Sequence, residues 1–495
     1  MGGLRDRAGE IDLAPTEFRR LGHELVDELS DFLESLPTRP VTPGESPREV
    51  RAALGEGPLP ERGAPAEELL RETADLLFQH SLLNGHPRFW GYIVGAPAPI
   101  GALADLLAAT VNPNVGGFVL APMATEIEAQ TVRWLAELVG FPSDCGGLLV
   151  SGGNMANFVA FLAARRAGAD WNVREDGAGR RRLRVYVSRE THTWIEKAAD
   201  LFGLGTGAIR WIATDARQRM DLTELRRQIA ADRVAGDTPL VVVGAGGTVS
   251  TGAVDPLDEI ARVCRAEGMW FHVDGAYGAV AAATPDAPPE LKALSEADSV
   301  ALDPHKWLYA PVEAGCALVR SREALLDAFS YRPPYYHLAR EQEDEPINYF
   351  EYGPQNSRGF RALKVWLALR QVGREGYVRM IGDDIRLARE LHDIVQAEPE
   401  LEPGTTSLSI TTFRYVPEGA AGDDEYLNEL NAELLTRLEG GGEAFVSNAV
   451  VDGRFYLRAC IVNFRTTLED VRALPAIVKR LGAEAHSELR ARVPG

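Results

Sequence analysis

Between residues 146 and 320, short apolar runs alternate with stretches of helical periodicity, and this alternation constrains the fold more than any other feature. The apolar runs are residues 148–150, 183–187, 240–243, 269–273, 299–302 and 316–319. Strands that are buried on both faces form continuous apolar runs, and helices between such strands are the crossovers of a parallel sheet. We therefore predict an α/β fold with a mostly parallel central sheet and helices on both of its faces.

The segments on either side of this region have a different character. Apolar residues at helical spacing predict helices at residues 15–36, 66–83, 122–139 and 359–398. The stretch 37–65 is rich in Pro and Gly and indicates an extended arm.

The chain is long enough for more than one core. After residue 398, the strand-like segments TSLSITTFRYV and RFYLRACIVNF indicate a smaller α+β domain. The predicted division is an N-terminal helical arm (1–110), a large domain (111–370) and a small C-terminal domain (371–495).

Composition excludes several classes of function. The 495 residues include 52 Lys+Arg and 72 Asp+Glu, and the net charge of −20 opposes binding to nucleic acid or anionic membranes. The N-terminus lacks the apolar core of a secretion signal, so we expect a cytoplasmic protein. No CxxC or CxxH spacing predicts a metal site or a disulfide framework, and we expect core thiols. The cysteines are Cys145, Cys264, Cys316 and Cys460.

Three of the predicted strands are followed by residues that can carry chemistry. Ser151–Asn154 (SGGN) leads into a helix, and glycines at a helix N-terminus favour phosphate. Asp274 ends another strand, and Lys306 follows a third in SVALDPHKWLYAP. Ligands of open α/β sheets bind at the carboxyl ends of the strands. Taken singly, each feature also has an ordinary explanation: a turn, a helix cap, or a lysine whose ammonium reaches solvent.

Pyridoxal phosphate (PLP) is the cofactor that uses all three features together. It needs an amine for its aldehyde, a carboxylate for its pyridine nitrogen, and a cradle for its phosphate. His192 follows a predicted strand and is a candidate to lie against the ring, although a surface or capping histidine is the alternative.

Five motifs resemble those of a known family. They are SGGNMAN (151–157), HTWIEKA (192–198), GTVSTGAVDP (247–256), HVDGAYG (272–278) and DPHKW (303–307). In sequence and spacing they are similar to the group II PLP-dependent decarboxylases, most of all to the aromatic-L-amino-acid decarboxylase branch. The resemblance runs from about residue 15 to about residue 480. It implies the fold-type I PLP-dependent transferase architecture and the conversion of an L-amino acid, aromatic or bulky and hydrophobic, to its amine and CO2.

The resemblance also implies residue roles. Lys306 is the expected Schiff-base lysine, Asp274 the partner of the pyridine nitrogen, His192 the stacking ring and His305 a proton donor. The remaining cofactor-binding residues implied are Gly152, Gly153, Asn154, Thr248, Ala276 and Asp303. Asp303 stands where the aromatic branch often has asparagine, and an acid beside a phosphate needs a shared proton.

For the substrate, the resemblance implies the residues Tyr92, Ile93, Asn114, Gly116 and Arg458. Asn114 and Gly116 are expected either from the same chain or from the partner chain. Several positions that are aromatic in the animal enzymes are not aromatic here, so a wider pocket is expected. Arg88 apart, no Arg or Lys stands among the pocket positions, which makes glutamate a less favoured substrate.

In the family a loop tyrosine reaches the neighbouring subunit's site, and this implies a homodimer. The matching residue is Tyr335, with Tyr336 as the alternative. Other fold-type I reactions, aldehyde synthesis or amino transfer with Arg458 as the carboxylate clamp, remain alternatives. So does a nicotinamide-dependent oxidoreductase, suggested by GLGTG (203–207) and GAGG (244–247), although neither has the full GxGxxG spacing.

A first prediction concerns Tyr335. Once CO2 has left, Cα must receive a proton, and a phenol can deliver it while water is kept out. We expect Tyr335→Phe to slow amine formation and divert turnover to aldehyde, ammonia and peroxide. The measurement is amine, aldehyde and peroxide from one incubation in air. Amine at the unchanged rate without aldehyde would point to Tyr336 or His305 instead.

Overall fold

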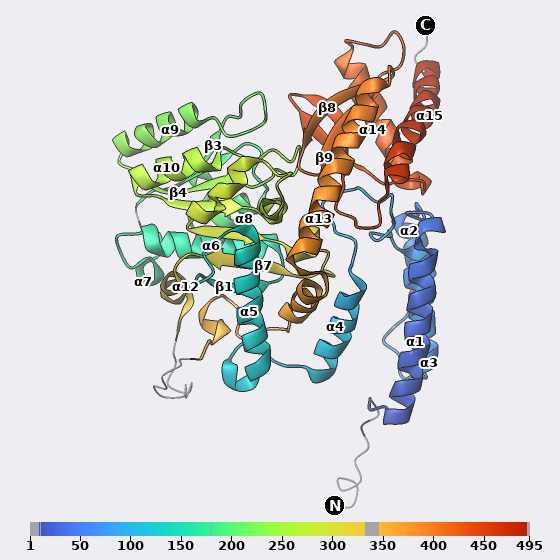
Figure 1. Ribbon diagram of the computed structural model, residues 1–495, viewed down its shortest axis with the longest axis horizontal. Coiled ribbons are helices and arrows are strands. Elements are labelled where there is room, and N and C mark those ends of the chain that lie inside the picture. Colours follow the sequence, from blue (N-terminus) through green and yellow to red (C-terminus); the bar gives the residue numbers. More distant parts are fainter. Residues whose placement is uncertain (1–8, 10, 180, 332–345, 493–495) are drawn as a thin grey trace, which may run out of the picture.

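The computed structural model describes residues 9, 11–179, 181–331 and 346–492. Its central feature is a seven-stranded sheet in the order β1-β7-β6-β5-β4-β2-β3 (Figure 1). The strands are β1 (Gly146–Val150), β2 (Leu183–Ser188), β3 (Ile209–Ile212), β4 (Thr238–Ala245), β5 (Trp270–Asp274), β6 (Ser299–Leu302) and β7 (Gly315–Val319). Each of the six predicted apolar runs lies in one of these strands, and β3 is an addition.

Most of the strands run in one direction. The pairs β3–β2, β2–β4, β4–β5 and β5–β6 are parallel, whereas β7 is antiparallel to both β6 and β1. β1 therefore points the same way as β6. The carboxyl ends of β1, β2, β4, β5 and β6 consequently meet at one edge of the sheet, and the predicted mostly parallel topology is confirmed.

Helices cover both faces of the sheet because its apolar side chains point to both sides. On one face lie α6 (Gly153–Gly168), α8 (Trp194–Leu201) and α12 (Arg322–Phe329). On the other lie α5 (Pro122–Val139), α9 (Leu222–Val234) and α10 (Leu257–Glu267). Apolar cores fill the space between each helix layer and the sheet. The short helices α7 (Val173–Asp176) and α11 (Pro304–Trp307) lie in connections.

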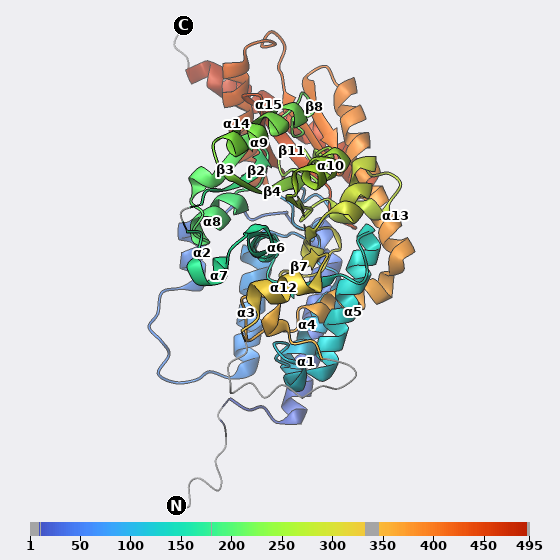
Figure 2. The same cartoon turned by 90° about the vertical axis from the view of Figure 1, so that its left-hand side faces the viewer.

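A second, antiparallel sheet forms the core of the C-terminal part, in the order β10-β11-β9-β8. Its strands are β8 (Leu401–Ser407), β9 (Ile410–Tyr415), β10 (Ser447–Val451) and β11 (Arg454–Cys460). The helices packed with it are α14 (Asp424–Gly441) and α15 (Leu468–Arg492). Figure 2 shows α14 and α15 at one end of the molecule and α1 at the other.

The long helix α13 (Ala362–Ala397) links the two sheets. Ile381 and Ile385 pack in the core of the large sheet, whereas Leu391 and Val395 pack in that of the small one. The domain boundary predicted at residue 370 falls inside this helix. The three-part division of the chain stays a prediction.

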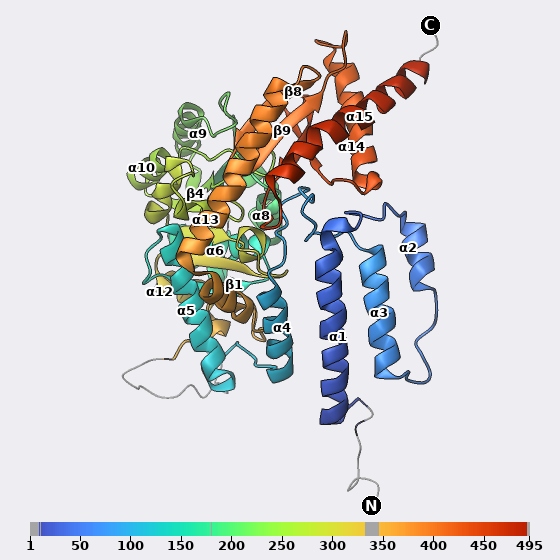
Figure 3. The ribbon, with the colours of Figure 1, turned by 45° about the vertical axis from the view of Figure 1, so that its right-hand side comes forward.

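The N-terminal arm contains α1 (Pro15–Ser35), α2 (Pro47–Leu54) and α3 (Ala66–His80), which lie beside the body of the molecule (Figure 3). Helix α4 (Pro99–Val111) follows and packs on α13. The extended arm predicted for 37–65 is wrong at α2. This helix begins with a capping box, in which the Ser46 N–H donates to Glu49 Oε2 at 2.8 Å. None of the described helices is long and apolar enough to cross a lipid bilayer.

Behind β6, the buried carboxylate of Asp384 on α13 anchors the chain around Lys306. Its Oδ2 accepts hydrogen bonds from Trp307 Nε1 at 2.8 Å and from the Tyr309 hydroxyl at 2.7 Å. Burial raises the pKa of Asp384 from its ordinary value of 3.8 to about 7. The folded chain thus binds this proton more tightly than the unfolded chain, so stability falls as pH rises from about 4 to about 7.

We expect Asp384→Asn to raise the unfolding temperature relative to the parent protein at pH 8, and this gain to shrink toward pH 5. The amide has no proton to lose, and its oxygen can still accept both hydrogen bonds. Scanning calorimetry at both pH values measures the difference. Asp383→Asn, at a neighbouring exposed carboxylate, is the control and should change the unfolding temperature equally at the two pH values. A gain from Asp384→Asn that does not depend on pH would contradict the assignment.

Candidate active site

A cavity of about 310 Å³ opens at the carboxyl ends of the parallel strands. Most of the predicted cofactor and catalytic residues line it. These are Gly152, Gly153, Asn154, His192, Thr248, Asp274, Ala276, Asp303, His305 and Lys306, with Ile93 from the predicted substrate set. They come from five separate connections, so the parallel sheet is what brings them together.

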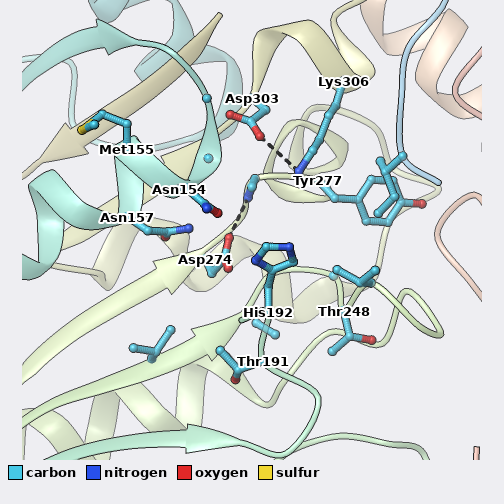
Figure 4. A pocket seen from close by; sticks show the side chains of 18 of the residues that line it. Asn154, Met155, Asn157, Thr191, His192, Thr248, Asp274, Tyr277, Asp303 and Lys306 are labelled. Atoms are coloured by element: carbon cyan, nitrogen blue, oxygen red, sulfur yellow. Dashed lines mark hydrogen bonds and ion pairs between the residues drawn. The ribbon is translucent and has the colours of Figure 1, made fainter. Parts of the chain in front are cut away.

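Lys306 lies on α11, directly after β6, and its side chain points into the cavity (Figure 4). Its Nζ is 3.1 Å from Oδ2 of Asp303. The lysine side chain is 21% exposed and that of Asp303 2%, so the amine faces the cavity while its partner is buried. The lysine is thus partly desolvated and open to a ligand, as a nucleophilic amine requires.

Asp303 and His305 form the wall next to this amine. Oδ1 of Asp303 is buried and has no hydrogen-bond partner among the described residues. His305 Nε2 lies 3.8 Å from Asp303 Oδ2, and His305 Nδ1 lies 2.8 Å from the Ala314 carbonyl oxygen. Because a carbonyl can only accept, Nδ1 donates, and Nε2 is the atom that can take up or release a proton. Burial lowers the pKa of His305, which favours the neutral ring.

Asp274 ends β5 and is held from two directions. Its Oδ2 accepts a hydrogen bond from Trp194 Nε1 at 2.7 Å, and its Oδ1 accepts one from the Ala276 N–H at 3.2 Å. His192 lies beside it in the cavity (Figure 4). Desolvation lowers the pKa of His192, and the carboxylate of Asp274 partly opposes this shift. A carboxylate and an imidazole thus stand together at the centre of the cavity.

The start of α6 contributes the third component. Gly152 has φ +146°, and a Cβ atom on Gly153 would lie 2.7 Å from Asp303 Oδ2. Both positions therefore need glycine. The backbone N–H groups of the first helical turn have no partner within the helix, and together with the helix dipole they favour an anion.

Other predicted substrate residues do not line the cavity of this chain. Tyr92, Asn114, Gly116 and Arg458 all lie outside it. The Arg458 guanidinium donates to the Val249 carbonyl and to Ser447 Oγ, so it is already occupied.

Asn114 Oδ1 accepts hydrogen bonds from the N–H groups of Gly116 and Arg358, at 3.1 and 3.0 Å. This amide therefore shapes its own loop. Tyr335 and Tyr336 lie outside the described residues, and their role stays a prediction.

The cavity also contains residues that the sequence analysis did not name as site residues. They are Ser151, Met155, Asn157, Glu190, Thr191, Val243, Ala245, Gly247, Val249 and Tyr277. Most are neighbours in sequence of predicted residues, and that adjacency was the available signal. Tyr277 stacks on Trp307 with ring centroids 5.0 Å apart and thereby packs against the lysine helix.

These groups match the requirements of one cofactor. An open amine, a fixed carboxylate, an imidazole beside it and a glycine-lined helix N-terminus are the groups that PLP uses for its aldehyde, pyridine nitrogen, ring face and phosphate. The residues present therefore fit PLP.

Comparison with known proteins decides the family. Residues 47–415 match the model of the pyridoxal-dependent decarboxylase conserved domain. The chain belongs to this family. It is 34% identical to an aromatic-L-amino-acid decarboxylase of Bacillus atrophaeus, over 96% of this chain and 97% of that protein.

Two further relatives extend the comparison. A structure of Oryza sativa TDC with PLP and tryptamine has a TM-score of 0.89 and 28% identity, covering 97% of this chain and 99% of that one. A phenylacetaldehyde synthase of a Rosa hybrid cultivar is 28% identical, over 91% of this chain and 90% of that protein.

The family assignment confirms the main sequence predictions. The protein is a PLP-dependent amino-acid decarboxylase, a carboxy-lyase, and its architecture is fold-type I. The nicotinamide-dependent alternative is therefore wrong. Gly247, at the end of GAGG, lines the PLP cavity instead.

Proposed function

We propose that this decarboxylase acts on aromatic L-amino acids and releases the corresponding amine and CO2. The observation that carries the proposal is the arrangement of Lys306, Asp274 and His192 around one cavity whose other walls are largely uncharged. Bound PLP draws electrons away from the substrate's Cα, so that its carboxylate can leave as CO2.

Each residue has a separate task in this reaction. Lys306 Nζ holds the aldehyde of the cofactor and is exchanged for the substrate amine. Asp274 holds the ring nitrogen in its protonated form, and His192 covers the ring face. Gly153 and Asn154 bind the phosphate through the N-terminus of α6. This assignment accounts for every ionisable group at the centre of the cavity except Asp303 and His305.

His305 supplies the proton that the exchange at Lys306 requires. Its Nδ1–H is held by the Ala314 carbonyl, so the ring cannot rotate and Nε2 stays directed toward Asp303. The neighbouring Lys306 Nζ lies 3.1 Å from the same carboxylate. Asp303 thus connects the two groups, and a proton can pass between them through its buried oxygen.

The cavity walls support an aromatic substrate over an acidic one. Among the described residues that line the cavity, Lys306 is the sole Lys or Arg. The guanidinium of Arg458 is occupied by Val249 and Ser447. An acidic side chain would therefore enter without a cationic partner, which is costly. Ile93, Val249 and Tyr277 offer apolar and aromatic surface instead.

A panel of L-amino acids tests the substrate class. We expect kcat/KM for CO2 release from tryptophan, tyrosine or phenylalanine to exceed that for glutamate by at least about 100-fold. Lys306→Ala, the matched control, should lose at least about 1000-fold in turnover, since no other group in the cavity can exchange cofactor and substrate. Glutamate as the preferred substrate would overturn the proposal.

Aldehyde formation is a second candidate function, because the Rosa relative is a phenylacetaldehyde synthase. Both functions begin with loss of CO2 and differ in the later fate of Cα. Aldehyde and peroxide measured alongside the amine in the same panel distinguish them.

We further propose that the protein is a cytoplasmic homodimer with shared active sites. The four cysteines are free thiols, which fits a reducing compartment. Helix α4 exposes four large apolar side chains, each more than half exposed: Leu103, Leu106, Leu107 and Val111. On the adjacent arm, Phe18 and Leu77 are also more than half exposed. A continuous apolar surface of this kind supports association with a second copy.

Sedimentation tests the dimer. We expect a particle of twice the 53.9 kDa of one chain at micromolar concentration. Leu103→Asp combined with Leu107→Asp places charges in the proposed interface and should shift the protein toward single chains. Val234→Asp, at an exposed apolar residue on the distant α9, is the control and should leave the mass unchanged. A parent protein that sediments as a single chain would contradict the proposal.

A further inference from the structure

We propose that Trp194 is a positioning residue whose indole N–H fixes the carboxylate of Asp274 for the cofactor ring. The inference rests on the proposed function, because it requires Asp274 to be the partner of the ring nitrogen. Trp194 is the first residue of α8 and is fully buried. It does not line the cavity, so it acts through Asp274 and not on the ligand.

The contact with Asp274 is short and directional. Trp194 Nε1 lies 2.7 Å from Asp274 Oδ2. An indole N–H can only donate and a carboxylate oxygen can only accept, so this bond has one possible polarity. With Oδ1 held by the Ala276 N–H, each carboxylate oxygen has its own anchor. Rotation about the terminal side-chain bond of Asp274 would break both hydrogen bonds.

The indole is itself fixed by its neighbours. Its ring packs edge-on against Phe161 of α6, with centroids 6.4 Å apart, and against His272 of β5, with centroids 5.8 Å apart. His272 is held at both nitrogens, by Ser299 Oγ at 2.8 Å and by Asn157 Oδ1 at 2.7 Å. Burial lowers the pKa of His272 to about 4, so this ring is neutral near pH 7 and brings no competing charge toward Asp274.

The backbone of Trp194 meets the second ring-facing group. Its N–H donates to His192 Nδ1 at 3.3 Å. This N–H belongs to the first turn of α8 and has no partner within the helix. Asp274 and His192 are thus both hydrogen-bonded to the same residue, one through the side chain and one through the main chain. A substitution of the side chain removes the first bond and keeps the second.

A double-mutant cycle measures this coupling without relying on turnover. The four proteins are the parent, Trp194→Phe, Asp274→Ala and the double variant, and the readout is the Kd for PLP. A hydrogen bond to a charged acceptor supports an expected loss of about tenfold in PLP affinity for Trp194→Phe. In the Asp274→Ala background the same substitution should change the Kd less than twofold, since its acceptor is already absent.

The unfolding temperature of the PLP-free proteins gives the structural part of the effect. Loss of packing around a buried indole lowers this temperature in both backgrounds alike. An equal loss of PLP affinity in both backgrounds would overturn the positioning role and leave the proposed function intact. Parent-like PLP affinity and turnover in Asp274→Ala would overturn the proposed function itself. The two failures are therefore distinguishable.

Two further variants sharpen the test. Trp270→Phe removes another indole N–H, which donates to Ser299 Oγ at 2.8 Å and not to Asp274, and should change the Kd less than twofold. Benzothienylalanine at position 194 keeps the shape of the indole and replaces its N–H by sulfur. If Trp194→Phe fails to fold, this analogue carries the cycle. Parent-like affinity with the analogue would overturn the inference.

Discussion

The common direction of the parallel strands is the constraint on which the site depends. Parallel strands need crossover helices, so every chain segment that leaves a strand at the carboxyl edge begins a connection there. Asp274, Lys306 and the glycines before α6 lie on three such connections, far apart in sequence and lining one cavity. β7 returns antiparallel between β6 and β1, and this direct return places the glycine turn beside Asp303.

A buried ion pair secures the end of β1, where the glycine turn starts. Glu128 on α5 and Arg358 are both almost fully buried and contact each other. The same carboxylate accepts from the Leu149 N–H at 2.8 Å, and the guanidinium donates to the Leu149 and Val115 carbonyls. Removal of one member of such a pair costs about 3–5 kcal/mol, because the other charge stays buried without a partner. The rigidity of the phosphate cradle therefore has its origin one layer behind the cavity.

The sequence predicted the large domain well because its signals are local. A strand buried on both faces is a continuous apolar run, and Asp274 and Lys306 follow such runs directly. Strand β3 was missed since it lies at the sheet edge and its middle residues are partly exposed, which removes the apolar run. Helix α2 has no buried residue, so apolar spacing could not reveal it, although the Ser46–Glu49 capping box was readable.

Longer-range features could not be read from the sequence. Arg458 stands in a segment that resembles a carboxylate-binding strand, yet its guanidinium is occupied by a loop 209 positions away in the chain. The bond between Trp194 and Asp274 spans 80 positions and depends on the packing of α8 against β5. Neither follows from spacing or composition, because both are decided by which side chains the folded layers bring within hydrogen-bond distance.

The charge balance of the site explains why His305 stands next to the reactive lysine. Asp303 is buried, and Lys306 is the nearest cation to it at 3.1 Å. An amine that reacts with an aldehyde can no longer serve Asp303 as a full ammonium partner, and a buried carboxylate without a partner is costly. His305 Nε2, at 3.8 Å from the same oxygen, is the remaining group that can bring a proton to it. The pair of basic side chains thus lets Lys306 leave its carboxylate without stranding a buried charge.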